Sequence, residues 1–438
     1  MKMGKGQALY TRAKAVIPGG TQLLSKRPEM ILPAQWPSYY SRAKGIEVWD
    51  LDGNRYIDMS YNGVGSCILG VGDPDVDAAV IAVINSGSMS TLNCPEEVEL
   101  AGLLCELHPW AGMVRYARGG GEAMSIAVRI ARSFTGKERI AFSGYHGWHD
   151  WYLAANLAEQ RALDGHLLPG LESSGVPRGL QGTALPFRYN HIEELQDIVA
   201  RHGDDLAAII IEPIRRNDPA PGYLKGVREL AYQTGAVLIV DEVSAGFRLN
   251  TGGAHLVYGL EPDVAVFAKA MSNGYPMAAV IGKTSIMQAA QDTFISSTYW
   301  TERIGPAAAL ATLRKHRREQ VADHLIRIGN SIQAGWRNAA EQANLSVDIG
   351  GMPPISHLSF LCENSQAVHT LFTQNMLERG FLAAKAFYAT YAHREEHVEA
   401  YLASIREVFT ILAKALAEGT VMASLKGPVA HSGFHRLT

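Results

Sequence analysis

Five short apolar runs, most of them separated by helical patterns, constrain the fold of this chain more than any other feature. They lie at 139–147, 207–214, 236–243, 263–270 and 278–283. Near-continuous runs rich in β-branched residues are typical of parallel strands that are buried on both faces. Stretches between them, such as EELQDIVARHG and GVRELAYQTG, have the spacing of helices. The middle of the chain therefore predicts an α/β domain whose mostly parallel sheet is covered by helices on both faces.

The two ends of the chain have a different character. Near the start, EVWDLDGNRYIDMS contains two alternating runs around a turn sequence, which predicts a β-hairpin. After Pro306, long stretches with apolar residues at i, i+3 and i+4 predict helices, and ISHLSFLC predicts a strand. We expect a large α/β domain at 66–310 and a smaller α+β domain built from residues 1–65 and 311–438.

Composition excludes several classes of function. With 40 basic and 43 acidic residues among 438, the formal charge of −3 gives no electrostatic reason to expect nucleic acid or an anionic membrane as a partner. No apolar run approaches the roughly 18 residues of a membrane span, and the N-terminus lacks a signal-peptide core, so we expect a cytoplasmic protein. The four cysteines form no Cys-x-x-Cys pair, and neither a disulfide framework nor a metal site is expected.

A carboxylate and a lysine follow two of the apolar runs. Asp241 closes AVLIVD, and Lys269 follows VAVFA. In parallel sheets, ligands bind at the carboxyl ends of the strands, so one shared site is expected. A lysine can form a Schiff base, and a carboxylate can hold a pyridine nitrogen protonated.

A glycine turn at 119–121 precedes a helical pattern that runs to residue 132. The three glycines of RGGGEAMSIAVRIAR end at Gly121, and the apolar residues after them share one helix face. The free N–H groups at a helix start attract an anion, and glycine permits close backbone approach. Together with Asp241 and Lys269, this turn predicts a pyridoxal phosphate site.

With these motifs in place, the chain resembles the class III aminotransferases of pyridoxal phosphate fold type I, and within them the glutamate-1-semialdehyde aminomutase-like branch. IPGG, the hairpin, the glycine turn, YHGWHD, IIIEPI, VDEVSAGFR and FAKAMSNGYP occur in the family's order from about Ile17 to the end. The resemblance implies a pyridoxal phosphate enzyme with a seven-stranded-type sheet in its large domain.

The resemblance assigns roles to individual residues. It implies that Lys269 binds the cofactor covalently, that Asp241 bonds the pyridine nitrogen, and that Tyr145 and Val243 pack on the two faces of the ring. These are the groups for which a catalytic or ring-positioning role is expected.

The rest of the expected cofactor shell also comes from the resemblance. Gly120 and Gly121 match the phosphate turn, and Asn217 matches a polar residue near the phenolic oxygen. Family members accept a threonine from the partner subunit at the phosphate, and either Thr298 or Thr301 could serve, with Thr298 favoured by its Ser-Thr-aromatic context. A homodimer with shared active sites is therefore implied.

The substrate side departs from the branch it resembles. Where an arginine grips the substrate carboxylate in the aminomutases, this chain has Lys26, with Arg27 beside it. A lysine is a point charge rather than a bidentate fork. His146 is predicted to be a structural or substrate-contacting group. The aromatics Trp36, Tyr39 and Tyr40 fit a carbohydrate-facing entrance.

Three functions are compatible with these residues. The first is an aminotransferase that moves an amino group, with L-glutamate as donor, to an aldehyde or keto group of a sugar-like acceptor. It resembles 8-amino-3,8-dideoxy-octulosonate-type transaminases, which would imply amino sugar and lipopolysaccharide biosynthesis. The second is a glutamate-1-semialdehyde 2,1-aminomutase. The third is a non-catalytic regulator that binds pyridoxal phosphate, which the intact motif residues disfavour.

Overall fold

The computed structural model describes residues 4–166 and 169–434, which divide into two compact units. The larger unit spans Pro74–Asp323, and the smaller one combines the residues up to Asp73 with those from His324 on. The smaller unit is therefore built from both chain ends. Among the described residues, no helix is long and apolar enough to cross a membrane.

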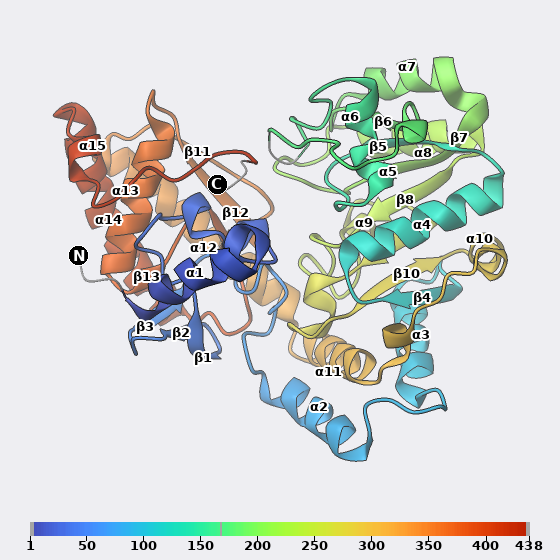
Figure 1. Cartoon of the computed structure of the whole chain (residues 1–438), viewed down its shortest axis with the longest axis horizontal. Coiled ribbons are helices and arrows are strands. Elements are labelled where there is room, and N and C mark those ends of the chain that lie inside the picture. Colours follow the sequence, from blue (N-terminus) through green and yellow to red (C-terminus); the bar gives the residue numbers. More distant parts are fainter. Residues whose placement is uncertain (1–3, 167–168, 435–438) are drawn as a thin grey trace. The chain divides into compact units, whose positions relative to one another are not determined.

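A seven-stranded sheet forms the centre of the larger unit (Figure 1). The strand order is β4-β10-β9-β8-β7-β5-β6, and only β10 pairs antiparallel with its neighbours. The mostly parallel sheet predicted from the apolar runs is thereby confirmed. The strands are β4 (Met113–Ala117), β5 (Arg139–Ser143), β6 (Ala184–Pro186), β7 (Leu206–Ile211), β8 (Val237–Asp241), β9 (Val264–Phe267) and β10 (Ala278–Gly282).

Helices cover both faces of this sheet. In β8, Val237 and Ile239 pack in one apolar cluster with α4 (Gly120–Thr135). Leu238 and Val240 point the other way, into a second cluster with α7 (Ile192–His202) and α8 (Tyr223–Thr234). Because successive side chains of a strand alternate between faces, a continuous apolar run needs cover on both sides. The apolar pattern of the sequence has this cause.

Other helices of the larger unit lie beside these layers. The helix α11 (Ile304–Arg318) packs on α2 (Pro74–Ser86) and α3 (Pro95–Leu107). This packing keeps α11 with the larger unit, so the units separate after Asp73 and Asp323 rather than at the expected positions 65/66 and 310/311. The short helices are α5 (Asp150–Leu153), α6 (Ala155–Ala158), α9 (Ala254–Val257) and α10 (Thr284–Met287), and the 3₁₀ turns are η4 (Arg178–Leu180), η5 (Gly203–Asp205), η6 (Lys269–Ser272), η7 (Gln288–Asp292) and η8 (Thr298–Thr301).

The smaller unit contains the predicted hairpin. The strands β2 (Glu47–Asp50) and β3 (Arg55–Asp58) pair antiparallel, and the Asp50 carboxylate accepts hydrogen bonds from the backbone N–H groups of Asp52 and Asn54 in the turn. The strand β13 (Phe381–Leu382) pairs parallel with β3 and so joins the two chain ends in one sheet.

The remaining elements of the smaller unit complete two small sheets and their helical cover. The predicted strand in ISHLSFLC is present as β12 (Ile355–Phe360), and the predicted helix near the C-terminus is α14 (Glu395–Ala417). The other strands are β1 (Tyr40–Lys44), β11 (Val347–Gly350), β12 (Ile355–Phe360) and β14 (Ala386–Tyr388). The helices are α1 (Lys5–Val16), α12 (Val321–Ala343), which begins in the larger unit, α13 (Ser365–Glu378), α14 (Glu395–Ala417) and α15 (Val421–Ser424), with 3₁₀ turns η1 (Pro18–Gly20), η2 (Leu24–Lys26) and η3 (Pro28–Met30).

Candidate active site

The expected site residues of the larger unit meet at one edge of its sheet. The strands β7, β8 and β9 are adjacent and parallel, so their carboxyl ends lie side by side. Glu212 follows β7, Asp241 ends β8, and Lys269 begins the turn after β9. The charges of Asp241 and Glu212 both act on the pKa of Lys269, where they oppose the effect of burial.

Asp241 is buried and held by two hydrogen bonds. Its Oδ1 accepts from the backbone N–H of Val243 at 2.9 Å, and its Oδ2 lies 2.8 Å from Nδ1 of His146. The Nε2 of His146 lies 3.2 Å from the Ser143 carbonyl oxygen. Both ring nitrogens of His146 thus face hydrogen-bond acceptors. The structure places His146 behind Asp241, where it orients the carboxylate.

Lys269 has an environment that favours its neutral form. Burial, and next to it the positive charge of Arg248, lower the pKa of Lys269, while Asp241 and Glu212 oppose that shift. Its Nζ donates a hydrogen bond to Oγ of Ser244 at 2.7 Å. The backbone of Lys269 has φ 43°, a left-handed conformation that is strained for a lysine. A neutral amine is the form that acts as nucleophile and as base.

Tyr145 and Val243 lie on segments that follow β5 and β8. The Tyr145 side chain is 37% exposed and packs edge-on against Tyr152, with ring centroids 5.7 Å apart. Burial raises the pKa of Tyr145, and Asp241 adds to the shift. Val243 lies against Gly120 at the start of α4. Tyr145 therefore lies within the electrostatic influence of Asp241, and Val243 lies against Gly120, and both Asp241 and Gly120 are expected to bind the cofactor.

The start of α4 is kept bare by glycine. A Cβ on Gly120 would lie 2.8 Å from Cγ1 of Val243, and one on Gly121 would lie 3.3 Å from Cα of Gly147. The Glu122 carboxylate caps the preceding backbone N–H of Gly119. Within the described residues, no acceptor bonds the N–H groups of Gly120 or Gly121. These two groups and the helix dipole form a fitting cradle for a phosphate.

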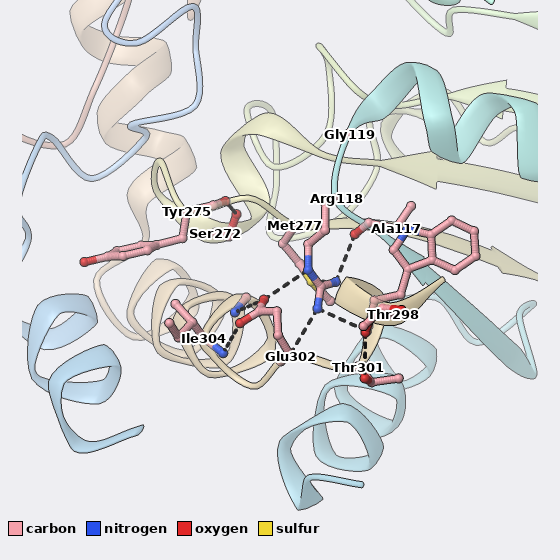
Figure 2. Close-up of polar contacts among 12 residues, drawn as sticks. Ala117, Arg118, Gly119, Ser272, Tyr275, Met277, Thr298, Thr301, Glu302 and Ile304 are labelled. Atoms are coloured by element: carbon pink, nitrogen blue, oxygen red, sulfur yellow. Dashed lines mark hydrogen bonds and ion pairs between the residues drawn. The ribbon is translucent and has the colours of Figure 1, made fainter. Parts of the chain in front are cut away.

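Arg118, next to this turn, anchors the segment that carries the expected threonines (Figure 2). Its Nε lies 3.0 Å from Oε1 of Glu302, and its Nη2 donates to the carbonyl oxygens of Trp300 and Glu302 at 3.1 and 3.0 Å. Thr298 and Thr301 are both exposed, and the Thr301 hydroxyl donates to the Thr298 carbonyl at 2.9 Å. The segment is fixed, and the Thr298 side chain faces solvent in the single chain.

Asn217 is not brought into this cluster. It is exposed in the loop after β7, and within the described parts of the chain no hydrogen bond or ion pair involves its side chain.

The same loop contributes Glu212, whose Oε2 lies 2.8 Å from Nε of Arg215. Burial, and then Asp241, raise the pKa of Glu212, while Arg215 lowers it. A Cβ on Gly144 would lie 2.4 Å from Glu212 Oε2.

Sequence reasoning missed three groups at this edge: Glu212, Ser244 and Arg248. Glu212 carried the same signal as Asp241, because it ends the apolar run AAIIIE. Ser244 and Arg248 lie in the turn after β8, where no pattern separates a site residue from an ordinary turn residue. Only their position after Asp241 could have drawn attention to them.

The expected substrate residues lie in the smaller unit. Lys26 ends η2 and is exposed, and its charge lowers the pKa of Asp58 against the larger, opposite effect of burial. Arg27 lies against the glycine turn, since a Cβ on Gly19 would be 2.4 Å from its Nη2. Arg27 is thus part of the local packing of its own unit.

The chain is similar to known proteins over most of its length. A family description, aminotransferase class-III, matches residues 33–421. A 3-aminobutyryl-CoA aminotransferase of Cloacimonas acidaminovorans is 33% identical over 95% of this chain and 99% of its own length. A glutamate-1-semialdehyde 2,1-aminomutase of Heliobacterium modesticaldum is 34% identical over 94% of this chain and 98% of its own. A 2'-deamino-2'-hydroxyneamine transaminase of Streptomyces kanamyceticus is 34% identical over 74% and 78%.

The fold has close counterparts among solved structures. The FumI protein of Sphingopyxis sp. MTA144, solved in a form that contains pyridoxal phosphate, matches with a TM-score of 0.86 at 25% identity. The match covers 94% of this chain and 97% of that one. The similarity confirms the expected fold type I and the expected cofactor.

Proposed function

The chain belongs to the class III aminotransferase family, and on that premise we propose that it transfers an amino group from L-glutamate to the aldehyde or keto group of a small, sugar-like acceptor. The observation that carries the reaction type is the convergence of Lys269, Asp241 and the bare start of α4 at one sheet edge. Amino sugar formation is the setting we infer for it.

The residues of this edge fit pyridoxal phosphate. The glycine cradle at Gly120 and Gly121 has backbone N–H donors for the phosphate, and Asp241 has a carboxylate for the ring nitrogen. Tyr145 and Val243 supply the two packing surfaces. When bound, the cofactor provides a ring that accepts the electron pair left by a breaking C–H bond.

Each side chain then has a physical task. Lys269 accepts a proton from the substrate's α-carbon at Nζ and returns it, and burial, which lowers the pKa of Lys269, favours the neutral amine that this role needs. Asp241 stabilises the protonated ring nitrogen, and His146 holds that carboxylate in place. Tyr145 and Val243 fix the ring plane so that the breaking bond lies along the π system.

The acceptor is inferred from the substrate-side residues. Lys26 replaces the arginine that the resemblance leads one to expect, and a point charge suits an acidic group on a hydroxyl-rich molecule. Arg27 is engaged with the Gly19 turn, so Lys26 is the better candidate. The transaminase relative from Streptomyces kanamyceticus, by its name, acts on a neamine derivative, which supports a polyhydroxylated acceptor.

A 2,1-aminomutase is the second candidate, because one relative carries that name. The two activities differ in one observable: a mutase converts a single compound, whereas an aminotransferase needs a donor and an acceptor. We expect glutamate alone to convert the bound cofactor to its pyridoxamine form, which absorbance records. Efficient conversion of glutamate-1-semialdehyde to 5-aminolevulinate without a donor would establish the mutase instead.

The acceptor proposal has its own test. Lys26→Ala should lower kcat/KM for the acidic acceptor by about 10- to 150-fold, the value of one charge-assisted contact. The glutamate half-reaction should change less. Lys414→Ala, an exposed lysine of α14 in the same unit, is the matched control. Equal kinetics for the Lys26 and Lys414 variants would remove Lys26 from substrate recognition.

A further inference from the structure

The Lys269 side chain donates a hydrogen bond to the hydroxyl group of Ser244, to which the roles proposed above assign no task. Nζ of Lys269 lies 2.7 Å from Oγ of Ser244, in hydrogen-bond geometry. Ser244 follows Asp241 by three positions, in the turn after β8, and Lys269 begins the turn after the adjacent strand β9. The turn after β8 therefore contributes two groups to the site, a carboxylate for the ring and a hydroxyl for the lysine.

The Ser244 hydroxyl is held in position by its backbone. The N–H of Gly246 donates to the carbonyl of Glu242 at 2.8 Å, which closes the turn. The carbonyl oxygen of Ser244 accepts a hydrogen bond from Nε of the buried Arg248 at 2.6 Å. The second of these contacts uses the backbone carbonyl of Ser244, and neither uses its side chain, which bonds Lys269. The hydroxyl is thus preorganised, and the turn does not depend on it.

The contact has a directional effect on a neutral amine. A neutral Nζ has two hydrogens and one lone pair. When one hydrogen is donated to Ser244, rotation about the terminal bond is restricted, and the lone pair points in one direction. Burial and Arg248 lower the pKa of Lys269 and so favour this neutral form. A base with a fixed lone pair loses less orientational freedom on the way to the transition state than a free one.

We propose that Ser244 is a positioning residue for the proton transfer, whose hydroxyl accepts a hydrogen bond from the released Lys269 amine and directs the lone pair of that amine at the substrate's α-hydrogen. The step is a proton transfer: the substrate's Cα–H bond breaks and an N–H bond forms at Nζ of Lys269. Bound pyridoxal phosphate would supply the acceptor for the electron pair, and Nζ would then give the same proton up again. The proposal rests on the proton-carrying role of Lys269 proposed above.

Two substitutions separate this role from a structural one. Ser244→Ala removes the hydroxyl and keeps the carbonyl that Arg248 contacts, so the turn should persist. Ser244→Thr keeps a hydroxyl. The control is Ser272→Ala, which removes a buried hydrogen bond to the Tyr275 carbonyl in the turn of Lys269 without touching Nζ. It reports what loss of local packing alone does.

The first readout is the single-turnover reaction with protiated and α-deuterated glutamate. Ser244→Ala should slow it about tenfold at saturation, the effect of one hydrogen bond, with a deuterium isotope effect at least as large as that of the unchanged enzyme. Ser244→Thr should stay within about threefold of the unchanged enzyme, and Ser272→Ala should keep its isotope effect. An unchanged rate and isotope effect in Ser244→Ala would overturn the proposal.

The second readout needs no turnover. Apoenzyme is mixed with pyridoxal phosphate, and its capture by Lys269 is followed by absorbance. Ser244→Ala should capture it about tenfold more slowly at an unchanged thermal midpoint, because the amine is no longer aimed. Capture at the normal rate would contradict the role of Ser244. If no amine reacts with the unchanged enzyme, the aminotransferase proposal fails, and this arm still decides the contact between Ser244 and Lys269.

Discussion

At the scale of single residues, position at a strand end separates the groups that could be predicted from those that could not. Asp241 and Lys269 were expected because each follows a buried apolar strand, and ligands bind at the carboxyl ends of parallel strands. In the structure, His146 is the partner of Asp241 and Ser244 is the partner of Lys269. Asn217 was expected from the resemblance alone, and its side chain is exposed in a loop.

Asp241→Asn should keep the shape of the side chain and remove its charge. We expect kcat to fall by about 10- to 150-fold, because a neutral amide no longer stabilises a protonated ring nitrogen. Cofactor affinity should fall less, since Lys269 and the glycine cradle remain. Steady-state kinetics and a cofactor titration measure the two effects. Asp218→Asn, in the exposed loop after β7, is the control, and similar kinetics for both variants would show that Asp241 is not the ring partner.

At the scale of elements, strands within long apolar runs could be predicted from the sequence, whereas very short strands could not. The strands β5, β7, β8, β9 and β10 were expected from their apolar runs, since burial on both faces leaves a continuous signal. By contrast, β6 has three residues and β13 has two. So few residues carry no period, and their pairing is decided by the neighbouring strand rather than by their own sequence.

The start of α4 allows a sharp test of the phosphate cradle. Gly120→Ala would place a Cβ 2.8 Å from Val243, whose branched side chain has little freedom to move. We expect the dissociation constant for pyridoxal phosphate to rise about tenfold, because Val243, which is expected to pack on the cofactor ring, must shift. Gly119→Ala is the matched control, since nothing lies within 4 Å of its Cβ position. Equal affinities for the two variants would argue against the cradle.

At the scale of the whole molecule, exposed apolar side chains flank the expected intersubunit contact. Phe294 is 93% exposed and Tyr299 is 70% exposed, on either side of Thr298. Together with the intersubunit threonine that the resemblance implies, these two exposed side chains fit a surface that another chain covers. We therefore expect sedimentation to give a dimer or a multiple of one.

The same dimer should place one threonine at the partner's phosphate. Thr298→Val or Thr301→Val should weaken pyridoxal phosphate binding about tenfold without dissociating the dimer, because one hydrogen bond to a charged group is lost. The two variants serve as controls for each other, and Thr298 is expected to show the effect. A fully active monomer, or unchanged affinity in both variants, would contradict the shared site.

Buried histidines should make the whole molecule sensitive to acid. Burial lowers the pKa of several of them, most strongly for five: to about 4 for His108, His166 and His316, and to about 3 for His369 and His393. An unfolded chain binds these protons near pH 6.5, so it holds more protons than the folded one between about pH 6.5 and 4. Stability contributed by the neutral rings is complete above that window and is lost as the pH falls through it.

This loss can be measured as a slope. The thermal midpoint should fall steadily from pH 6.5 to 4. In His316→Gln, whose side chain cannot titrate, the fall should be shallower, because unfolding takes up roughly one proton fewer. The five rings belong to both units, three to the larger and two to the smaller, so each unit should lose stability in the same pH range. A midpoint that stays constant from pH 6.5 to 4.5 would mean that these rings are protonated in the folded protein, and that buried acceptors pair with their second proton.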